Sequence, residues 1–200
     1  MYPEHGVVMG PYFNEHHWIS CLAASILNGC LTLGVAPLNI AELDETFSSC
    51  ETDLAAEDWV IKQLEAASGG KGSPDFGGYR LSDAHEVLGA TWELHEDRPS
   101  IEQIKAAVDQ RKPVIVGIEM KDPMPFWHAI AILPTPTTWE QFYYKEYHRD
   151  RPYLIVQPGP CPCEWPLWGN FCDAWGLTEV LSKYTLYDGW LEGPPAEETK

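Results

Sequence analysis

The chain has 200 residues, enough for one domain with an ordinary hydrophobic core. Its hydrophobic share of 44% and its nine tryptophans indicate a folded globular protein rather than a disordered one. With 30 acidic and 13 basic residues the formal net charge is -17, a field that repels phosphate backbones and excludes nucleic acid as an expected partner. The same field can steer basic peptides or amine-bearing substrates to the protein.

The compartment is inferred from missing signals and from the cysteines. The segment MYPEHGVVMGPYF lacks a basic region followed by an apolar run, so no signal peptide is expected. No stretch approaches the about 18 apolar residues that a membrane span needs, so no membrane contact is expected. We therefore expect a cytoplasmic protein whose six cysteines are thiols.

Helices are expected in the first half of the chain. Apolar residues at helical spacing, together with capping and stop signals, predict them at residues 19–31, about 39–47, 53–67, 82–88 and 101–112. Ser100 and Gln103 have the spacing of a capping box before the last of these. The glycine-rich stretch 69–78 is expected to be a loop, and the segment 91–96 to be extended.

Strands dominate the second half. Short β-branched runs bounded by Pro, Asp and Gly predict strands of one sheet at residues 114–120, 128–133 and 153–157. An aromatic insertion at 134–152 separates the last two, and a short helix is expected at 177–182. Helices first and strands second favour an α+β fold over an alternating parallel one. We expect a single domain over 1–200, mainly helical at 11–110 and mainly sheet at 111–190.

The segment NEHHWISCLAAS contains the first candidate for chemistry. The apolar stripe of the first helix includes Ile26, Leu27 and Cys30, and Cys21 projects away from it. We therefore expect Cys30 to pack in the core and Cys21 to face away from it. At a helix start, unpaired N–H groups and the helix dipole stabilise a thiolate, and the same groups can hold an oxyanion. The alternative is a half-buried cysteine that happens to begin a helix.

A thiolate nucleophile needs an imidazole within hydrogen-bond reach. His128 is the best candidate, because it opens the run HAIAIL after a turn, where its ring is expected at a sheet edge. The alternative is a histidine that is merely satisfied at a strand start. Histidines 5, 85, 95 and 148 lie in polar segments and are expected at the surface.

Four segments carry a resemblance to a known family. In order they are PYFNEHHWISCLAASIL, PSIEQIKAAVDQRKPVIVGI, FWHAIAIL and YLIVQPGP, within residues 11–160. Together they resemble the papain-like cysteine peptidases, and among these the bacteriocin-processing (double-glycine) peptidases and their stand-alone bacterial relatives. The resemblance implies a papain-like fold, in which an N-terminal helical half with a Cys-initiated helix packs on a C-terminal antiparallel sheet.

The resemblance also implies roles for individual residues. Cys21 matches the nucleophile and His128 the general base. Glu15 stands where the family has its oxyanion-hole glutamine, and the neighbouring Asn14 can supply an amide instead. Gln157 stands where the family has an aspartate, and its carbonyl can still orient the imidazole. The residues expected to line the substrate cleft are His17, Trp18 and Trp127.

These observations lead to one main function and three alternatives. The main prediction is a cysteine hydrolase, a peptidase or amidase that acts on a peptide or protein through a thioester and needs no cofactor or metal. Release by an amine instead of water would make it an acyltransferase. Loss of catalysis would leave a papain-like module that binds a peptide or protein partner. A zinc-stabilised interaction domain is the last alternative, because Cys161, Cys163 and Cys172 form C-x-C-x8-C, although zinc sites usually use C-x2-C pairs.

Overall fold

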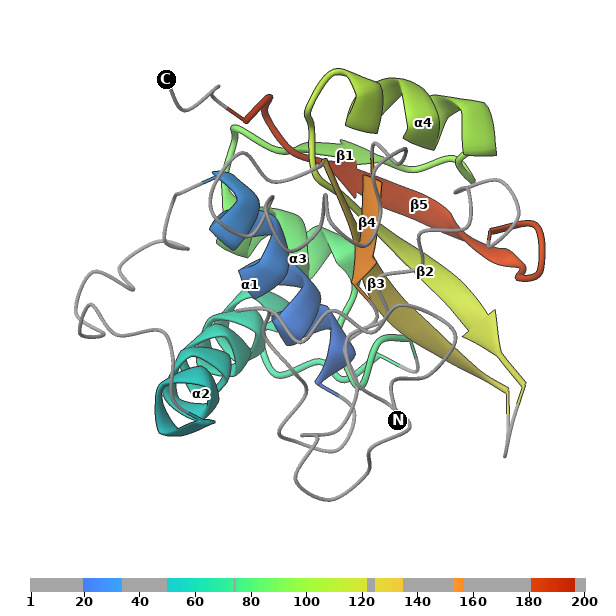
Figure 1. The fold of residues 1–200 in the computed structure, drawn as a ribbon. Helices are drawn as coiled ribbons and strands as arrows, with labels where there is room; N and C mark the ends of the chain where they lie inside the picture. The colour runs from blue at the N-terminus through green and yellow to red at the C-terminus, as the bar shows by residue number, and fades with distance from the viewer. Residues whose placement is uncertain are drawn as a thin grey trace, which may run out of the picture.

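The computed structural model describes residues 20–33, 50–73, 75–121, 125–134, 153–156 and 181–196. Within these ranges the chain forms helices and one sheet (Figure 1). The helices are α1 (Cys21–Leu33), α2 (Cys50–Ser68), α3 (Leu81–Leu88) and α4 (Ile101–Asp109). The strands are β1 (Glu93–His95), β2 (Val114–Met120), β3 (Phe126–Pro134), β4 (Tyr153–Val156) and β5 (Leu186–Glu192). The predicted α+β class is confirmed.

All strand pairs in the sheet are antiparallel, and the strand order is β1-β5-β2-β3-β4. Strands β2 and β3 pair along their length, with Ile118 opposite His128. Strand β4 pairs only with the second half of β3, from Ala131 opposite Val156 to Pro134 opposite Tyr153. The three β-branched runs of the sequence therefore lie side by side in one sheet, as predicted.

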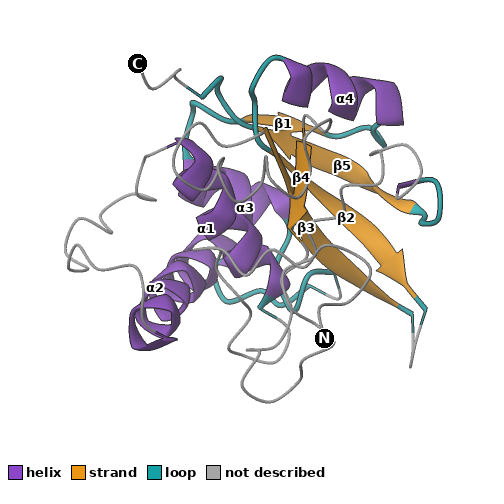
Figure 2. Cartoon of the chain, viewed as in Figure 1, coloured by secondary structure: helices purple, strands orange, loops and turns teal. Residues whose placement is uncertain are grey.

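Alternate residues of the sheet pack into two separate cores, one on each face. On one face, Ile115 and Ala129 pack with α1, α2 and α3. On the other face, Val116 and Ile130 pack with α4. Figure 2 shows the same arrangement, with α1, α2 and α3 grouped on one side of the sheet and α4 apart from them. The described part of the chain is therefore a three-layer structure with the sheet in the middle.

The helix ends follow the local signals. The Ser100 hydroxyl accepts the Gln103 N–H at 3.1 Å and the Gln103 side chain accepts the Ser100 N–H at 2.9 Å, so the predicted capping box is confirmed. Helix α4 ends at Asp109, three residues before the predicted end, and Arg111 follows with a positive φ of 62°. Helix α2 ends at Ser68, and Gly69 and Gly70 follow with positive φ, as its predicted stop requires.

Strand β5 was not predicted, and its geometry explains why. Its sequence LYDGWLE holds Asp188 and Gly189, which disfavour strands. Between the pairs Val116–Trp190 and Ile118–Leu186, β2 has one residue and β5 has three, so β5 bulges. Gly189 has a φ of 119°, and a Cβ there would lie 3.2 Å from the His95 carbonyl oxygen. The strand therefore depends on its neighbours rather than on its own propensity.

Three predicted segments fall largely or wholly outside the described residues: the helix at about 39–47, most of the insertion at 134–152, and most of the helix at 177–182. None of the described helices is long and apolar enough to cross a membrane.

Candidate active site

The structure brings the start of α1 against strand β3. The N–H of Ala129 donates a hydrogen bond to the Sγ of Cys21, with a nitrogen–sulfur distance of 3.4 Å. Ala129 directly follows His128. Two bonds of about 1.3 and 1.5 Å join the Ala129 nitrogen to the His128 Cα, so the sulfur lies within about 6 Å of that Cα. Two residues that are 107 positions apart in the chain are therefore neighbours in space.

The exposure expected for Cys21 was wrong. Its side chain is only 2% exposed and belongs to the core between α1, α2, α3 and the sheet. The reason is that α1 lies inside the fold and contacts α2, α3, β2 and β3, so every residue from Cys21 to Cys30 is buried. An amphipathic projection distinguishes two faces of a helix, but here both faces are covered.

Cys30 has the predicted role. It is 2% exposed, and burial raises the pKa of its thiol to about 12. The two thiols of α1 therefore share burial but differ in surroundings, because Cys21 also receives a hydrogen bond from the sheet.

His128 is buried as well, at 6% exposure. It is the third residue of β3 and precedes Ala131, where the pairing with β4 begins. The ring of Phe126 packs edge-on to its imidazole at a centroid distance of 6.3 Å. The predicted position near the start of a strand is confirmed. Because β4 pairs with β3 only from Ala131 onward, His128 lies before the part of β3 that β4 covers, and its side chain is buried.

Trp127 packs against the same core as Cys21 and is partly exposed. Its ring meets that of Tyr187 edge-on at 4.9 Å, and Tyr187 meets Phe76 in the same way at 4.9 Å. Burial, and next a hydrogen bond with Asp75, raise the pKa of Tyr187 to about 12. An aromatic cluster therefore adjoins the β3 segment that contains His128.

A buried carboxyl group that sequence reasoning missed contacts the residue before Cys21. Ser20, the residue before α1, donates a hydrogen bond from its hydroxyl to Oε1 of Glu57 on α2. Glu57 is fully buried, at 0% exposure, and Ser20 is 5% exposed. The sequence did contain a signal, because Glu57 shares a helical stripe with Val60, Ile61 and Leu64. A charged residue in an apolar stripe indicates a buried charge.

The buried polar residues of the described chain gather around α1. They are Ser20, Ser25, Asn28, Glu57 and His128. Among the described residues the Ser25 hydroxyl finds no hydrogen-bond partner, although it is fully buried. Ser25 lies one turn after Cys21, and Asn28 follows at the next turn, on the same face of α1. Buried polar groups are expensive and concentrate at functional sites, so α1 is where function is expected.

The remaining predicted site residues lie outside the described residues. They are Asn14, Glu15, His17, Trp18 and Gln157, and the cysteines 161, 163 and 172 of the zinc alternative lie there too. Within the described ranges, no three His, Cys, Asp or Glu side chains come together as metal ligands.

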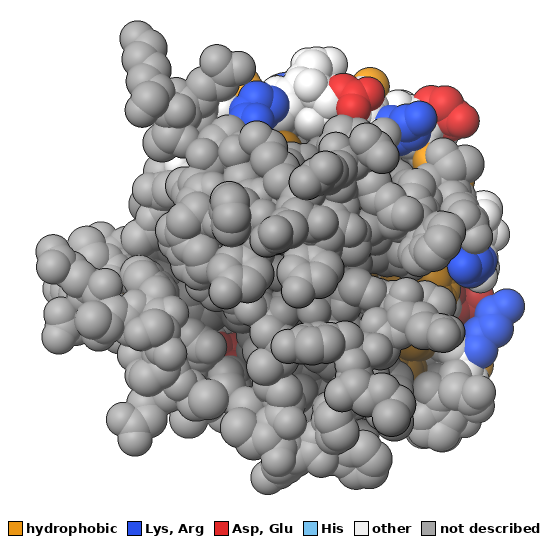
Figure 3. Space-filling model, in the orientation of Figure 1, with side chains coloured by type: hydrophobic (Ala, Val, Ile, Leu, Met, Phe, Trp, Pro, Cys, Tyr) orange, Lys and Arg blue, Asp and Glu red, His pale blue; other side chains and the backbone are white. Residues whose placement is uncertain are grey.

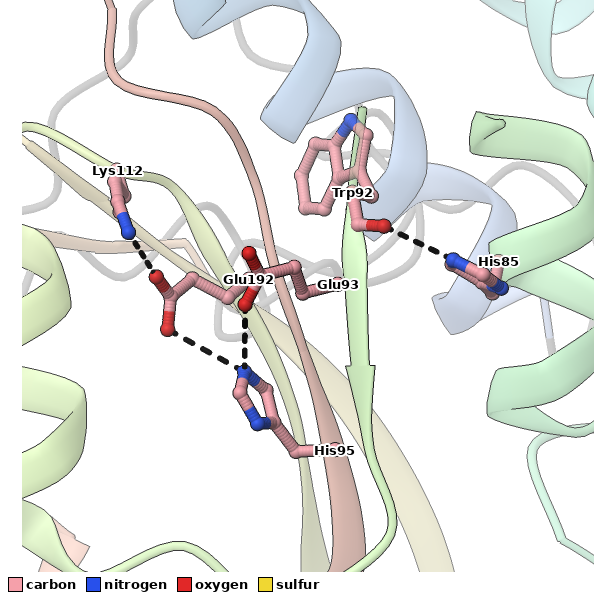
Figure 4. Close-up of polar contacts among 6 residues, drawn as sticks. All are labelled: His85, Trp92, Glu93, His95, Lys112 and Glu192. Atoms are coloured by element: carbon pink, nitrogen blue, oxygen red, sulfur yellow. Dashed lines mark hydrogen bonds and ion pairs between the residues drawn. The ribbon is translucent and has the colours of Figure 1, made fainter. Parts of the chain in front are cut away.

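Two histidines expected at the surface are partly buried and have structural partners (Figure 4). The His95 ring stacks on Trp190 at 4.1 Å, and its Nε2 lies 3.4 Å from Glu192, which also pairs with Lys112. His85 Nε2 lies 2.9 Å from the Trp92 carbonyl oxygen. His95 therefore ties β1 to β5, and His85 ties α3 to the residue before β1.

Charges are mixed on the described surface near α4. Figure 3 shows acidic and basic side chains alternating along the rim where α4 lies in Figure 1. The helix itself carries Glu102, Lys105 and Asp109. This rim therefore does not concentrate the negative charge of the chain.

No protein-family model matches this sequence, and no curated protein sequence matches it. Function is therefore inferred from the geometry around Cys21 and from the residues themselves.

Proposed function

We propose that the protein is a papain-like cysteine hydrolase, a peptidase or amidase, with Cys21 as nucleophile and His128 as general base. The observation that carries the proposal is the hydrogen bond from the Ala129 N–H to the Cys21 Sγ at 3.4 Å. It holds the sulfur within about 6 Å of the His128 Cα. One imidazole side chain spans such a distance. His128 alternates with Ala129 and so leaves β3 on the face of Ile130, which means that its ring has to turn around the edge of β3, beyond the end of β4, to meet the thiol.

The surroundings of the sulfur favour an anion in two ways. Cys21 is the first residue of α1, where unpaired N–H groups and the helix dipole stabilise negative charge. The Ala129 N–H adds a donor from the strand. Burial acts against the charge, so these donors are the groups that would have to offset it. The first-turn N–H groups would also face the oxyanion that forms on a substrate carbonyl.

The reaction follows from these positions. His128 takes the thiol proton and the Cys21 sulfur attacks the amide carbonyl carbon. The resulting tetrahedral intermediate collapses as His128 gives that proton to the leaving amine, and a thioester remains on Cys21. Water then attacks the thioester while His128 takes a proton from it, and the acid leaves as the thiol is restored. An amine in place of water would give acyl transfer.

A peptide or protein substrate with basic groups suits the charge of the chain. The net charge of -17 favours encounter with cationic partners. Trp127 and the aromatic cluster beside it offer apolar contact close to His128.

One observation favours a second candidate, a non-catalytic module that binds a peptide or protein. Cys21 is only 2% exposed and packs in the core, as a structural thiol does. A polar contact to the sheet would then serve folding alone.

Alkylation of the two thiols of α1 separates these candidates. The protein is treated with iodoacetamide at pH 6, and the peptides containing Cys21 and Cys30 are quantified by mass spectrometry in the native protein and in His128→Ala. The enzyme proposal predicts selective alkylation of Cys21 that slows at least tenfold in the variant, while Cys30 stays unreactive because burial raises its pKa to about 12. A Cys21 that reacts no faster than an ordinary thiol, with or without His128, contradicts the enzyme and supports the binding module.

A further inference from the structure

Glu57 is a buried titratable group that the proposed reaction does not use. Its carboxyl is fully buried and accepts a hydrogen bond from the Ser20 hydroxyl. Ser20 is the residue immediately before Cys21, so this contact lies one residue from the proposed nucleophile.

The chain at Ser20 is held from two sides. Its carbonyl oxygen accepts the Ala24 N–H at 3.1 Å, which is the first hydrogen bond of α1. Its hydroxyl is bound to α2 through Glu57. A backbone held at both its carbonyl and its side chain has little freedom to rotate, so the first turn of α1 is oriented relative to α2. The Cys21 Sγ leaves that same turn towards β3.

A negative charge on Glu57 would not activate the Cys21 thiol. A carboxylate close to a thiolate disfavours the second negative charge, whereas a helix N-terminus favours the carboxylate itself. A buried charge is also expensive unless it is paired. The contribution of Glu57 is therefore geometric. Its hydrogen bond with Ser20 joins two buried partners and fixes the direction of the Ser20 side chain as well as its distance from α2.

We propose that Glu57 is a positioning residue, which holds Ser20 and the first turn of α1 so that the Cys21 sulfur meets β3 beside His128. This inference rests on the function proposed above. It assigns a role on α2 to a residue that acts on the first turn of α1 through its hydrogen bond with Ser20.

The test measures how strongly Cys21 reactivity depends on His128 in different backgrounds. The second-order rate constant of Cys21 alkylation by iodoacetamide at pH 6 is measured with His128 present and in His128→Ala. The first rate constant is then divided by the second, which gives the His128 ratio of each background. The backgrounds are wild type, Ser20→Ala, Glu57→Met and Glu57→Gln. Easier access to a loosened site raises both rates of a pair, so access cancels from the ratio. Glu65→Gln, on the exposed part of α2, is the matched control.

We expect a ratio of at least ten in wild type and in Glu65→Gln. Glu57→Gln keeps an acceptor oxygen for Ser20, and its ratio stays within threefold of wild type. Ser20→Ala and Glu57→Met remove the hydrogen bond, and their ratios fall at least fivefold, towards one. Ser20→Ala removes one oxygen atom only, so it provides the test if Glu57→Met does not fold.

Three other results would contradict either the Cys21–His128 dyad or the positioning role of Glu57. A wild-type ratio near one overturns the Cys21–His128 dyad and this inference with it. A ratio above ten that survives Ser20→Ala and every Glu57 variant that folds overturns the positioning role and leaves the dyad standing. A ratio that collapses in Glu57→Gln but not in Ser20→Ala also overturns it, because the Ser20 contact would then not transmit the effect.

Discussion

The Sγ of Cys21 accepts a hydrogen bond from the backbone N–H of Ala129, 108 positions further along the chain. This bond joins the first turn of α1 to β3, and it has a consequence for stability. Cys21→Ala leaves a buried N–H without a partner, which costs about 1–2 kcal/mol beyond the lost packing. Cys30→Ala is the control, because Cys30 is equally buried and no described residue bonds to it. Urea unfolding should show a larger loss for Cys21→Ala, and equal losses would contradict this role of the bond.

Ser25→Ala should stabilise the protein. The Ser25 hydroxyl is fully buried and has no hydrogen-bond partner among the described residues, so its removal relieves a desolvation penalty. Alanine is also the better helix former. We expect a gain of about 1 kcal/mol, which raises the melting temperature by about 2–4 °C for a domain of this size. Ser20→Ala, which removes a partnered buried hydroxyl, should lower it; a fall in both variants would count against the argument.

Gly117→Ala should destabilise the sheet. A Cβ at Gly117 would lie 2.5 Å from the Phe76 ring and 2.7 Å from the Tyr187 Cβ, and the latter atom is fixed to its backbone. Overpacking of this kind costs about 1–3 kcal/mol, measured as a lower midpoint in urea. Gly72→Ala is the control, because a Cβ there meets nothing within 4 Å. If the two variants unfold at the same midpoint, Gly117 does not have the close contact described.

The stability of the protein should fall at alkaline pH, in part through Cys30. Burial raises the pKa of its thiol from 9.0 to about 12. From pH 9 upward the unfolded chain loses this proton while the folded chain keeps it, so the unfolding free energy decreases up to about pH 12. At pH 10.5 the loss is about 2 kcal/mol relative to neutral pH. The unfolding free energy is measured at pH 7.5 and at pH 10.5 in wild type and in Cys30→Ala. Between these two pH values it should decrease by about 2 kcal/mol less in Cys30→Ala than in wild type. An equal decrease in both proteins would exclude Cys30 as a cause.

Glu192→Gln should weaken the contact between β5 and the start of β2. The Glu192 carboxylate is 13% exposed and pairs with Lys112 and with His95. Its neutralisation leaves a half-buried lysine unpaired, which should cost about 1–2 kcal/mol. The control is the ion pair between Arg98 and Asp188, whose side chains are 53% and 70% exposed, respectively. Asp188→Asn breaks this pair and should change the free energy of unfolding by less than about 0.5 kcal/mol. Urea unfolding of both variants decides whether burial makes the difference.

Much of the fold follows from local patterns in the sequence. The stripe of α1, the capping box at Ser100 and Gln103, and the β-branched runs of β2, β3 and β4 act within a few residues of themselves. Such signals depend on helix periodicity and on backbone groups that nearby side chains can satisfy, so they can be interpreted without knowledge of the rest of the chain. The same patterns placed a cysteine at a helix start and a histidine near a strand start.

Tertiary structure alone decided what surrounds those two residues. Periodicity shows which face of α1 is apolar, but the burial of its other face depends on β3 and α2 lying against it, and these are distant in sequence. The pairing of β5 between β1 and β2, and the contact of Glu57 with Ser20, likewise join segments that no local rule connects. The sequence by itself thus determined where Cys21 and His128 stand in their elements. Packing determined that the Cys21 sulfur reaches β3 at Ala129 and that it is buried, because proximity between remote segments is a property of the whole core.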